Sequence, residues 1–284
     1  MRNFIERLLV FFVVFPLILS TVVFFSHKNH LILNIIIVAF TIAGALEFRN
    51  ILRSKNLDIS FPEAAILGGI SPVTWVLVVS FGLNWRIMPA AIIICAIWLL
   101  VSKILTNEDK FDNFINRIAA GFAIMIYPGL FIAWFIQMAV LPQAEMVILI
   151  FLLVVLLNDA FAWASGMLFG KNNKGFVKAS PGKSLSGFIG GMFASVLSGI
   201  LATVLIPQAF TSQVMPSMAA GAILGLAAGA AATLGDLCES AIKRSAGVKD
   251  SGKFLLGRGG ALDSIDSIVI AAPVYYLLYQ ALFT

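Results

Sequence analysis

The feature that most constrains this chain is a succession of long apolar segments separated by short polar stretches. A helix needs roughly 20 apolar residues to cross a hydrocarbon core about 30 Å thick. Nine segments approach this length, namely 5–25, 31–47, 64–83, 87–104, 118–140, 146–168, 184–206, 217–237 and 261–283. We therefore expect an all-α fold, a polytopic transmembrane helical bundle of about nine helices.

Composition supports lipid as the solvent for most of this chain. Of its 284 residues 60% are hydrophobic and 12% are charged, whereas a soluble domain carries about 25% charged residues. The first apolar run is flanked by Arg2 and Arg7, and it continues from about Leu8 to Phe25 without a small-residue cleavage site. Its length favours a spanning helix over a removable secretion signal.

The positions of the 19 lysines and arginines predict an orientation. With the N-terminus in the cytoplasm, nine spans place only Lys28 and Arg86 outside and the other 17 cations inside. Such a bias is what the positive-inside rule describes. We expect a cytoplasmic N-terminus and a C-terminus outside. The net charge of +5 then reflects membrane topology, and we expect no nucleic-acid partner.

Motif content divides the chain into two parts. Residues 1–117 hold four predicted spans and few motifs, whereas residues 118–284 hold five spans and the candidate chemistry. In the later spans small residues recur every fourth position, as at Gly221 and Gly225. This spacing predicts close packing of helix backbones, and it also permits a homodimer.

Four aspartates lie inside predicted spans or at their ends. They are Asp159, Asp236, Asp263 and Asp266, and the predicted topology puts all of them on the cytoplasmic side. An acid at the bilayer centre costs about 2.5–3.5 kcal/mol on insertion scales, so such residues are candidates for function. Asp263 and Asp266 are three residues apart and therefore share a helix face.

Basic and glycine-rich loops adjoin these acids. Each loop ends at the start of a predicted helix, where free N–H groups favour anions. Divalent cations bound by carboxylates could bridge to phosphate oxygens there. For any single lysine, a role as a topological anchor is the alternative. The candidate phosphate-binding residues are Ser180, Lys183, Ser184, Lys243, Arg244, Lys249, Arg258, Gly259 and Gly260.

Two other patterns are discounted. Gly182-Lys183-Ser184 matches the end of a P-loop, but Val177 stands where that motif requires glycine, and no strand precedes it. His27 and His30 lie in a predicted outer loop without an acidic companion. We expect no metal site at these histidines.

The run from Ser240 to Asp266 resembles the C-terminal signature of the phosphatidate cytidylyltransferase family, also called CDP-diacylglycerol synthases. A second stretch resembles the family's middle region, and the two cover roughly the C-terminal half. The matching residues of the first run are Ser240, Lys243, Arg244, Lys249, Asp250, Gly257, Gly259, Gly260, Asp263 and Asp266. Those of the second are Asn158-Asp159, Phe169-Gly170-Lys171, Ser180-Pro181-Gly182-Lys183-Ser184 and Gly187-Phe188-Ile189-Gly190-Gly191.

The resemblance implies transfer of CMP from CTP to phosphatidate, giving CDP-diacylglycerol and pyrophosphate. It implies dependence on Mg²⁺, with or without a second cation, and a bacterial inner membrane with the site facing the cytoplasm. Asp236 and Asp263 would be the principal metal ligands, completed by Asp266 and Asp159. The expected catalytic residues are Asp236, Asp263, Asp266 and Lys249. Lys243, Arg244 and Lys249 would hold the triphosphate and the lipid phosphate. A further phosphate would be bound by Lys183, Ser180 and Ser184. The other expected substrate-binding residues are Arg258, Gly259 and Gly260.

This chain departs from the family pattern at four positions. Arg258 stands where the family usually has His, and Ser264 where it usually has Arg. Leu256 replaces a common Pro, and Ser186 a frequent Glu or Gln. We hypothesise that Arg258 supplies the positive charge missing at position 264.

Other function classes share some of these features. An ion-coupled transporter also uses intramembrane acids, but it needs polar groups near the midplane and a path to both sides. The outer half of this bundle offers almost none. A CTP-dependent lipid kinase and an ether-lipid cytidylyltransferase would use similar phosphate chemistry, and a catalytically dead scaffold would rest on Arg258 and Ser264 alone.

Overall fold

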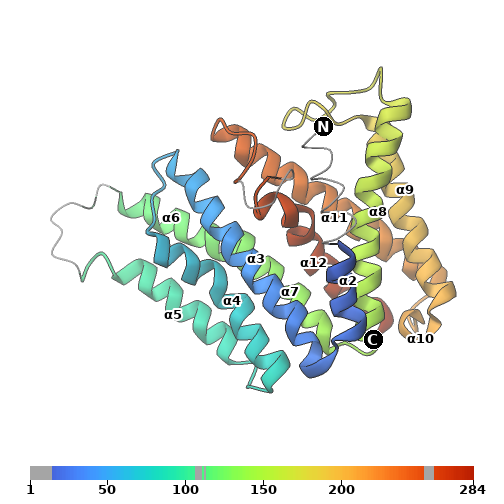
Figure 1. Cartoon of the computed structure of the whole chain (residues 1–284), viewed down its shortest axis with the longest axis horizontal. Coiled ribbons are helices and arrows are strands. Elements are labelled where there is room, and N and C mark those ends of the chain that lie inside the picture. The colour runs from blue at the N-terminus through green and yellow to red at the C-terminus, as the bar shows by residue number, and fades with distance from the viewer. Residues whose placement is uncertain (1–14, 106–110, 112, 253–258) are drawn as a thin grey trace. The chain divides into compact units, whose positions relative to one another are not determined.

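The computed structural model of this chain describes residues 15–105, 111, 113–252 and 259–284 (Figure 1). Within these ranges the regular structure is helical, and the isolated bridge between Lys174 and Ser184 belongs to no strand. The all-α prediction is confirmed for this part of the chain. The helices are α2 (Phe15–Phe24), α3 (His27–Arg53), α4 (Phe61–Phe81), α5 (Ile87–Val101), α6 (Phe114–Ile124), η2 (Met125–Leu130), α7 (Phe131–Gln137), η3 (Met138–Val140), α8 (Ala144–Phe169), α9 (Leu185–Leu205), α10 (Pro207–Phe210), α11 (Ser217–Ser245) and α12 (Leu262–Phe283).

Seven helical stretches are long and apolar enough to cross a membrane. They are α3, α4, the continuous run Phe114–Val140, α8, α9, α11 and α12. Each coincides with one of the nine predicted segments. The protein is thus an integral membrane protein by the length and composition of its helices.

The count of nine spans is not confirmed. Helix α5 has 15 residues, fewer than the roughly 20 that a bilayer requires. Helix α2 has 10 residues, and residues 5–14 of the first predicted segment lie outside the described ranges. The orientation of the two termini likewise stays a prediction.

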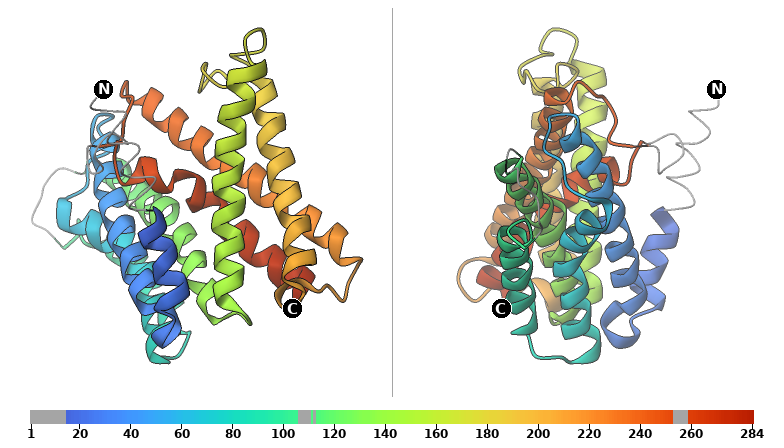
Figure 2. Two further views of the ribbon diagram at one scale, coloured as in Figure 1. Left: turned by 45° about the vertical axis from the view of Figure 1, so that its right-hand side comes forward. Right: turned by 90° about the vertical axis from the view of Figure 1, so that its left-hand side faces the viewer.

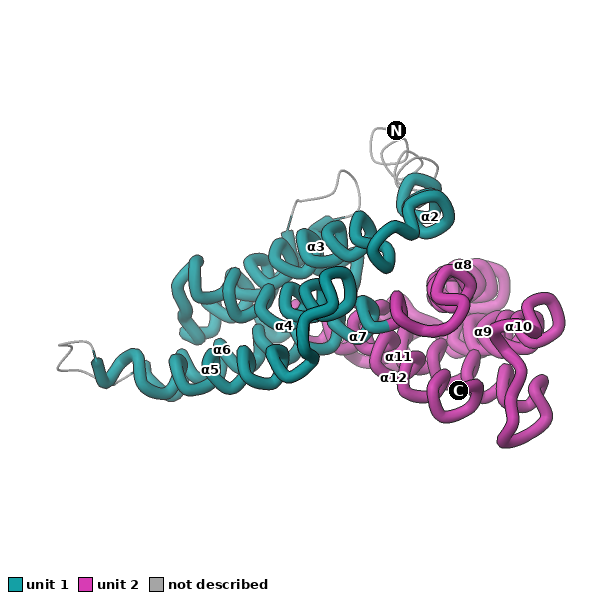
Figure 3. The backbone as a smooth tube through the Cα atoms, turned by 90° about the horizontal axis from the view of Figure 1, so that it is seen from below, with its two compact units in different colours: residues 1–137, 245–265 teal, residues 138–244, 266–284 magenta. Residues whose placement is uncertain are grey.

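The chain forms two compact units, coloured separately in Figure 3. Unit 1 comprises Met1–Gln137 and Ser245–Ile265, and unit 2 comprises Met138–Arg244 and Asp266–Thr284. Helix α12 therefore begins in unit 1 and continues in unit 2. We describe each unit by itself.

In unit 1, α3 packs along α4. A Cβ at Gly68 of α4 would overlap the Ala45 side chain of α3, so this contact requires glycine. A capping box at Ser60 and Glu63 starts α4, where it satisfies N–H groups that have no partner within the helix. Glu63 also pairs with the buried Arg117 of α6, so neither charge is buried alone.

In unit 2, α8 and α9 run side by side, as both views in Figure 2 show. Helices α9 and α11 approach through glycine, because a Cβ at Gly199 would overlap the backbone of Gly221. A Cβ at Gly225 would overlap the backbone of Ser195 in the same way. The prediction that the small residues serve close backbone packing is confirmed here.

Candidate active site

Unit 2 contains a pocket of about 530 Å³ built by α8, α9, α11 and the loop from α8 to α9. Its lining includes both charged and large apolar side chains. The polar side chains are Asn158, Asp159, Lys174, Lys183, Ser184, Thr233 and Asp236. Four of the large apolar ones are exposed, namely Trp163, Met167, Phe176 and Phe188. Such a lining can accept a ligand with an anionic head and an apolar body.

The central ion pair of the pocket joins Lys183 to Asp236, with Nζ and Oδ2 2.6 Å apart. The side chains are 29% and 33% exposed, so solvent screens the pair and its contribution to stability is small. Ser240 on α11 donates a hydrogen bond of 3.3 Å to the other oxygen of Asp236. The lysine can therefore exchange the carboxylate for another anion at little cost to the fold.

Ser184 has a structural partner in this pocket. Its Oγ accepts a 3.1 Å hydrogen bond from the N–H of Gly187 and caps the N-terminus of α9. The side chain is buried, and a Cβ at Gly170 would come within 2.7 Å of its hydroxyl. Ser180 is half-buried in the preceding loop and does not line the pocket. Of the predicted phosphate-binding triad, the pocket thus includes Lys183 and Ser184.

Asn158 lines the pocket and is not among the site residues predicted from the sequence. It is buried in α8, and its Nδ2 donates to Thr233 Oγ1 of α11 at 3.1 Å. Its Oδ1 accepts from Ser195 Oγ of α9 at 3.2 Å. Asn158 therefore ties three helices together beside Asp159. Its place in the Asn158-Asp159 pair that matches the family's middle region was the available signal.

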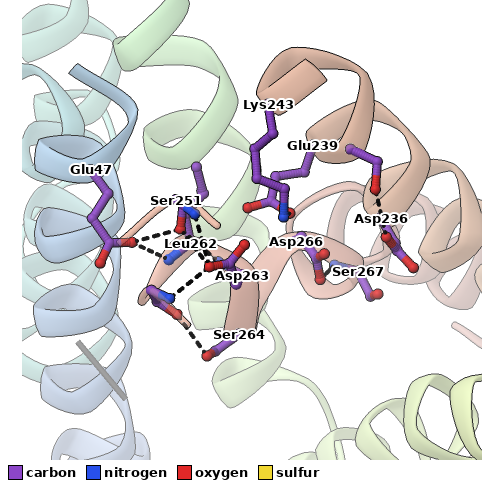
Figure 4. A network of polar contacts seen from close by, with 12 residues as sticks. Glu47, Asp236, Glu239, Lys243, Ser251, Leu262, Asp263, Ser264, Asp266 and Ser267 are labelled. Carbon is purple, nitrogen blue, oxygen red and sulfur yellow. Dashed lines mark hydrogen bonds and ion pairs between the residues drawn. The ribbon is translucent and has the colours of Figure 1, made fainter. Parts of the chain in front are cut away.

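Asp266 lies near the start of α12 and interacts electrostatically with Asp236, Asp159 and Lys243. One of its oxygens accepts a 2.6 Å hydrogen bond from the N–H of Ser267 (Figure 4). Lys243 of α11 also pairs with the buried Glu239 one turn earlier, at 2.5 Å. Unit 2 thus brings three of the four predicted acids into one electrostatic neighbourhood.

These acids fit a divalent cation in donor type, since Mg²⁺ prefers carboxylate oxygens. Asp159 and Asp236 line the same pocket. Among the described residues, however, no three acidic, histidine or cysteine side chains stand close enough together to hold a metal ion as they are placed. The carboxylates that a divalent cation would need are present, and one of them, Asp236, is paired with Lys183.

Asp263, the fourth acid, belongs to a hydrogen-bonded turn in unit 1. Its Oδ2 accepts from the N–H of Gly260 at 2.6 Å, and from the N–H and Oγ of Ser251 at 3.0 and 2.9 Å (Figure 4). Gly259 has a φ of +99°, a conformation that favours glycine. In the structure, both predicted substrate-binding glycines help shape this turn.

Glu47 of α3 completes the turn and is not among the site residues predicted from the sequence. Its Oε2 accepts from Ser251 Oγ at 3.0 Å and from the N–H of Leu262 at 2.9 Å. The residue ends the apolar segment 31–47, so the insertion cost that singles out the aspartates applies to it as well. That signal could have found it.

The remaining predicted residues lie on connecting segments. Arg244 is exposed in the last turn of α11, and Lys249 is exposed in the loop that follows. Arg258 lies outside the described residues. Their substrate-binding roles stay predictions.

Comparison with known proteins places the chain in a family. The cytidylyltransferase family model matches residues 5–282. A phosphatidate cytidylyltransferase of Thermotoga maritima is 33% identical over 189 residues, 64% of this chain and 66% of that protein. A phosphatidate cytidylyltransferase of Haemophilus influenzae is 42% identical over 122 residues, 43% and 41% of the two chains.

A third relative, the uncharacterized protein YnbB of Escherichia coli, is 32% identical over 181 residues, 63% of this chain and 58% of that protein. All three alignments span less than two thirds of the relative's own length. The family match, by contrast, runs nearly from one end of this sequence to the other. The chain therefore belongs to the cytidylyltransferase family.

Proposed function

We propose that this protein is a phosphatidate cytidylyltransferase, which transfers CMP from CTP to phosphatidate and releases pyrophosphate. The family match and the names of the relatives support this assignment. The observation that carries it in the structure is the unit 2 pocket, where Asp159, Asp236 and Lys183 lie beside exposed apolar side chains. Both substrates are anions, and one of them is a lipid.

The chemistry requires neutralisation of charge more than proton transfer. A phosphatidate oxygen forms a bond to the α-phosphorus of CTP, and the bond from that phosphorus to the β-phosphate oxygen breaks. The nucleophile is already an anion, so no strong general base is needed. Lys183 and Lys174 of the pocket would bind phosphate oxygens and stabilise the developing charge.

We infer that Asp159 and Asp236, which line the same pocket, would hold Mg²⁺, with Asp266 near the start of α12 as a further carboxylate. The cation would supply electrostatic stabilisation of the phosphates and orientation of the leaving group. Lys183 would then release Asp236 and contact substrate phosphate. A metal-binding role for Asp263 stays a prediction.

The lipid would be held at its head only. Trp163 and Met167, 68% and 62% exposed, lie on α8 beside the charged part of the pocket. They would face the acyl chains of phosphatidate, which remain in the bilayer. We propose further that the pocket opens to the cytoplasm at a bacterial inner membrane, that residues 118–284 carry the catalytic groups, and that the protein forms a homodimer.

A radiolabel assay tests the proposal. Purified protein in mixed micelles receives phosphatidate and CTP labelled on the α-phosphate, on cytosine or on the γ-phosphate, with Mg²⁺ or with EDTA. We expect the α-phosphate and cytosine labels, and not the γ-phosphate label, in a lipid product, with Mg²⁺ only. Absence of a cytidine lipid under all conditions would refute the function. Transfer of γ-phosphate alone would identify a lipid kinase, and product only from an ether lipid would change the substrate.

A further inference from the structure

Unit 1 contains a carboxylate that the proposed chemistry does not use. Glu47 lies inside α3, one turn after Gly44. Its Oε2 accepts hydrogen bonds from Ser251 Oγ and from the N–H of Leu262, which lie 204 and 215 residues further along the chain (Figure 4). This helix belongs to the part of the chain in which the sequence shows few motifs.

Leu262 is the first residue of α12. Free N–H groups at a helix start need acceptors, and a carboxylate there also interacts favourably with the helix dipole. Glu47 meets both needs. It therefore holds the end of the helix whose first turns carry Asp263 and Asp266.

Ser251 connects Glu47 to Asp263. Its Oγ lies 3.0 Å from Glu47 Oε2 and 2.9 Å from Asp263 Oδ2. A hydroxyl has one proton, so the two carboxylates compete for a single donor. The N–H groups of Ser251 and Gly260 remain bonded to Asp263. Glu47 and Asp263 thus both hold the turn in place through the hydroxyl of Ser251.

Glycine residues of the turn pack closely against the carboxylate of Glu47. A Cβ at Gly252 would overlap Glu47 Oε1, and a Cβ at Gly260 would overlap Oε2. A Cβ at Gly44 would stand 3.6 Å from the Cα of Leu262. The distance at Gly44 is an ordinary van der Waals contact, whereas Gly252 and Gly260 lie where no other side chain fits beside the Glu47 carboxylate.

We propose that Glu47 is a positioning residue, which fixes the start of α12 and the Ser251–Asp263 turn so that the acids of α12 are held ready for substrate. This inference rests on the proposed cytidylyltransferase function. Glu47 itself is not expected to touch CTP, lipid or metal.

The test compares Glu47→Ala with Glu47→Gln, whose amide oxygen can still accept both hydrogen bonds. We expect Glu47→Ala to lower kcat by about 30-fold, within the 10–100-fold range for partners of functional carboxylates, and to change the KM for CTP less than about threefold. Glu47→Gln should retain at least about a third of wild-type kcat. Asp58→Asn is the matched control, because Asp58 is an exposed acid that pairs with Arg49 and Arg53.

Amide hydrogen exchange in detergent provides a readout without substrate. In Glu47→Ala, exchange at Ser251, Gly260 and Leu262 should become at least about tenfold faster. In Glu47→Gln and Asp58→Asn it should stay near the wild-type rate. The helices of unit 2 should be unchanged in all three variants.

Two results would overturn the proposal. One is a Glu47→Ala enzyme with wild-type kcat, and the other is unchanged exchange at the three amides in that variant. A wild-type protein that makes no cytidine lipid would refute the function instead. The exchange comparison would then still decide whether Glu47 holds the turn.

Discussion

The sequence predicts the same role for Asp236 and Asp263, yet the structure holds the two carboxylates in different ways. Asp236 in unit 2 has a third of its side chain exposed, a lysine partner at 2.6 Å and one hydroxyl donor. Asp263 in unit 1 presents one oxygen to three donors of a tight turn, two of them backbone N–H groups.

The partner of Asp236 can therefore be exchanged for a ligand, whereas the partners of Asp263 are fixed parts of the fold. A side-chain cation can leave Asp236 when a ligand arrives, whereas backbone donors cannot leave Asp263 unless the turn opens. Removing a screened surface charge costs little stability, but removing a satisfied acceptor leaves donors unpaired. Substitutions at the two sites should therefore differ in their balance between activity and stability.

The largest effect is expected from Asp236→Asn. If Asp236 binds the cation, kcat should fall at least about 100-fold, while the melting temperature should change by less than about 2 °C because the pair with Lys183 is screened. The measurements are lipid cytidylation and thermal unfolding in detergent.

Asp263→Asn provides the contrast with that variant. It should lower activity and also reduce the melting temperature by about 3 °C or more, since the neutral amide oxygen accepts the three hydrogen bonds more weakly than the charged carboxylate does. Equal melting temperatures for the two variants would remove the distinction between the two sites. Wild-type turnover in Asp236→Asn would exclude it from metal binding.

Lys183→Met should have the next largest effect. Loss of a charged hydrogen-bond donor to phosphate should raise the KM for CTP or phosphatidate by about 10–100-fold, with little loss of stability. Lys178→Met is the control, because Lys178 lies exposed in the same loop and does not line the pocket. Equal kinetic effects of the two substitutions would show that general loop charge, and not the contact at Lys183, matters.

Asn158→Ala should have a moderate effect on both quantities. The substitution leaves Thr233 and Ser195 without their amide partner, and such interhelical bonds contribute about 1 kcal/mol in membranes. A decrease of about 2–4 °C in melting temperature should accompany a several-fold loss of activity.

Ser198→Ala is the matched control for that variant, because Ser198 is also buried in unit 2 but bonds to a carbonyl of its own helix. A melting temperature that falls as much in Ser198→Ala as in Asn158→Ala would refute the interhelical role of the amide.

The smallest effect is expected from Ser264→Arg. The Ser264 hydroxyl donates to the carbonyl of Gly260, and Arg258 already supplies a nearby cation in the sequence. Activity should change by less than about threefold. A large gain from this single substitution, measured in the same assay, would show that the site lacks a cation, and it would contradict compensation by Arg258.

Membrane character and helix positions could be predicted because they depend on local properties. A run of about 20 apolar residues must become a helix in lipid, whatever its neighbours are. The family pattern likewise occupies one continuous stretch, Ser240 to Asp266. The length of helix α5 was overestimated, because the apolar sequence continues to residue 104 although the helix ends at Val101.

The sequence by itself determined that this chain is a helical membrane protein with an acidic and basic phosphate-handling signature, because residue type and spacing along the chain suffice for both. Only the tertiary structure decided which side chains are partners. It pairs Lys183 with Asp236, gives Ser184 to a helix cap, and brings Glu47 to a turn more than 200 residues away. Such partnerships depend on distances in space between segments remote in sequence, which no local pattern specifies.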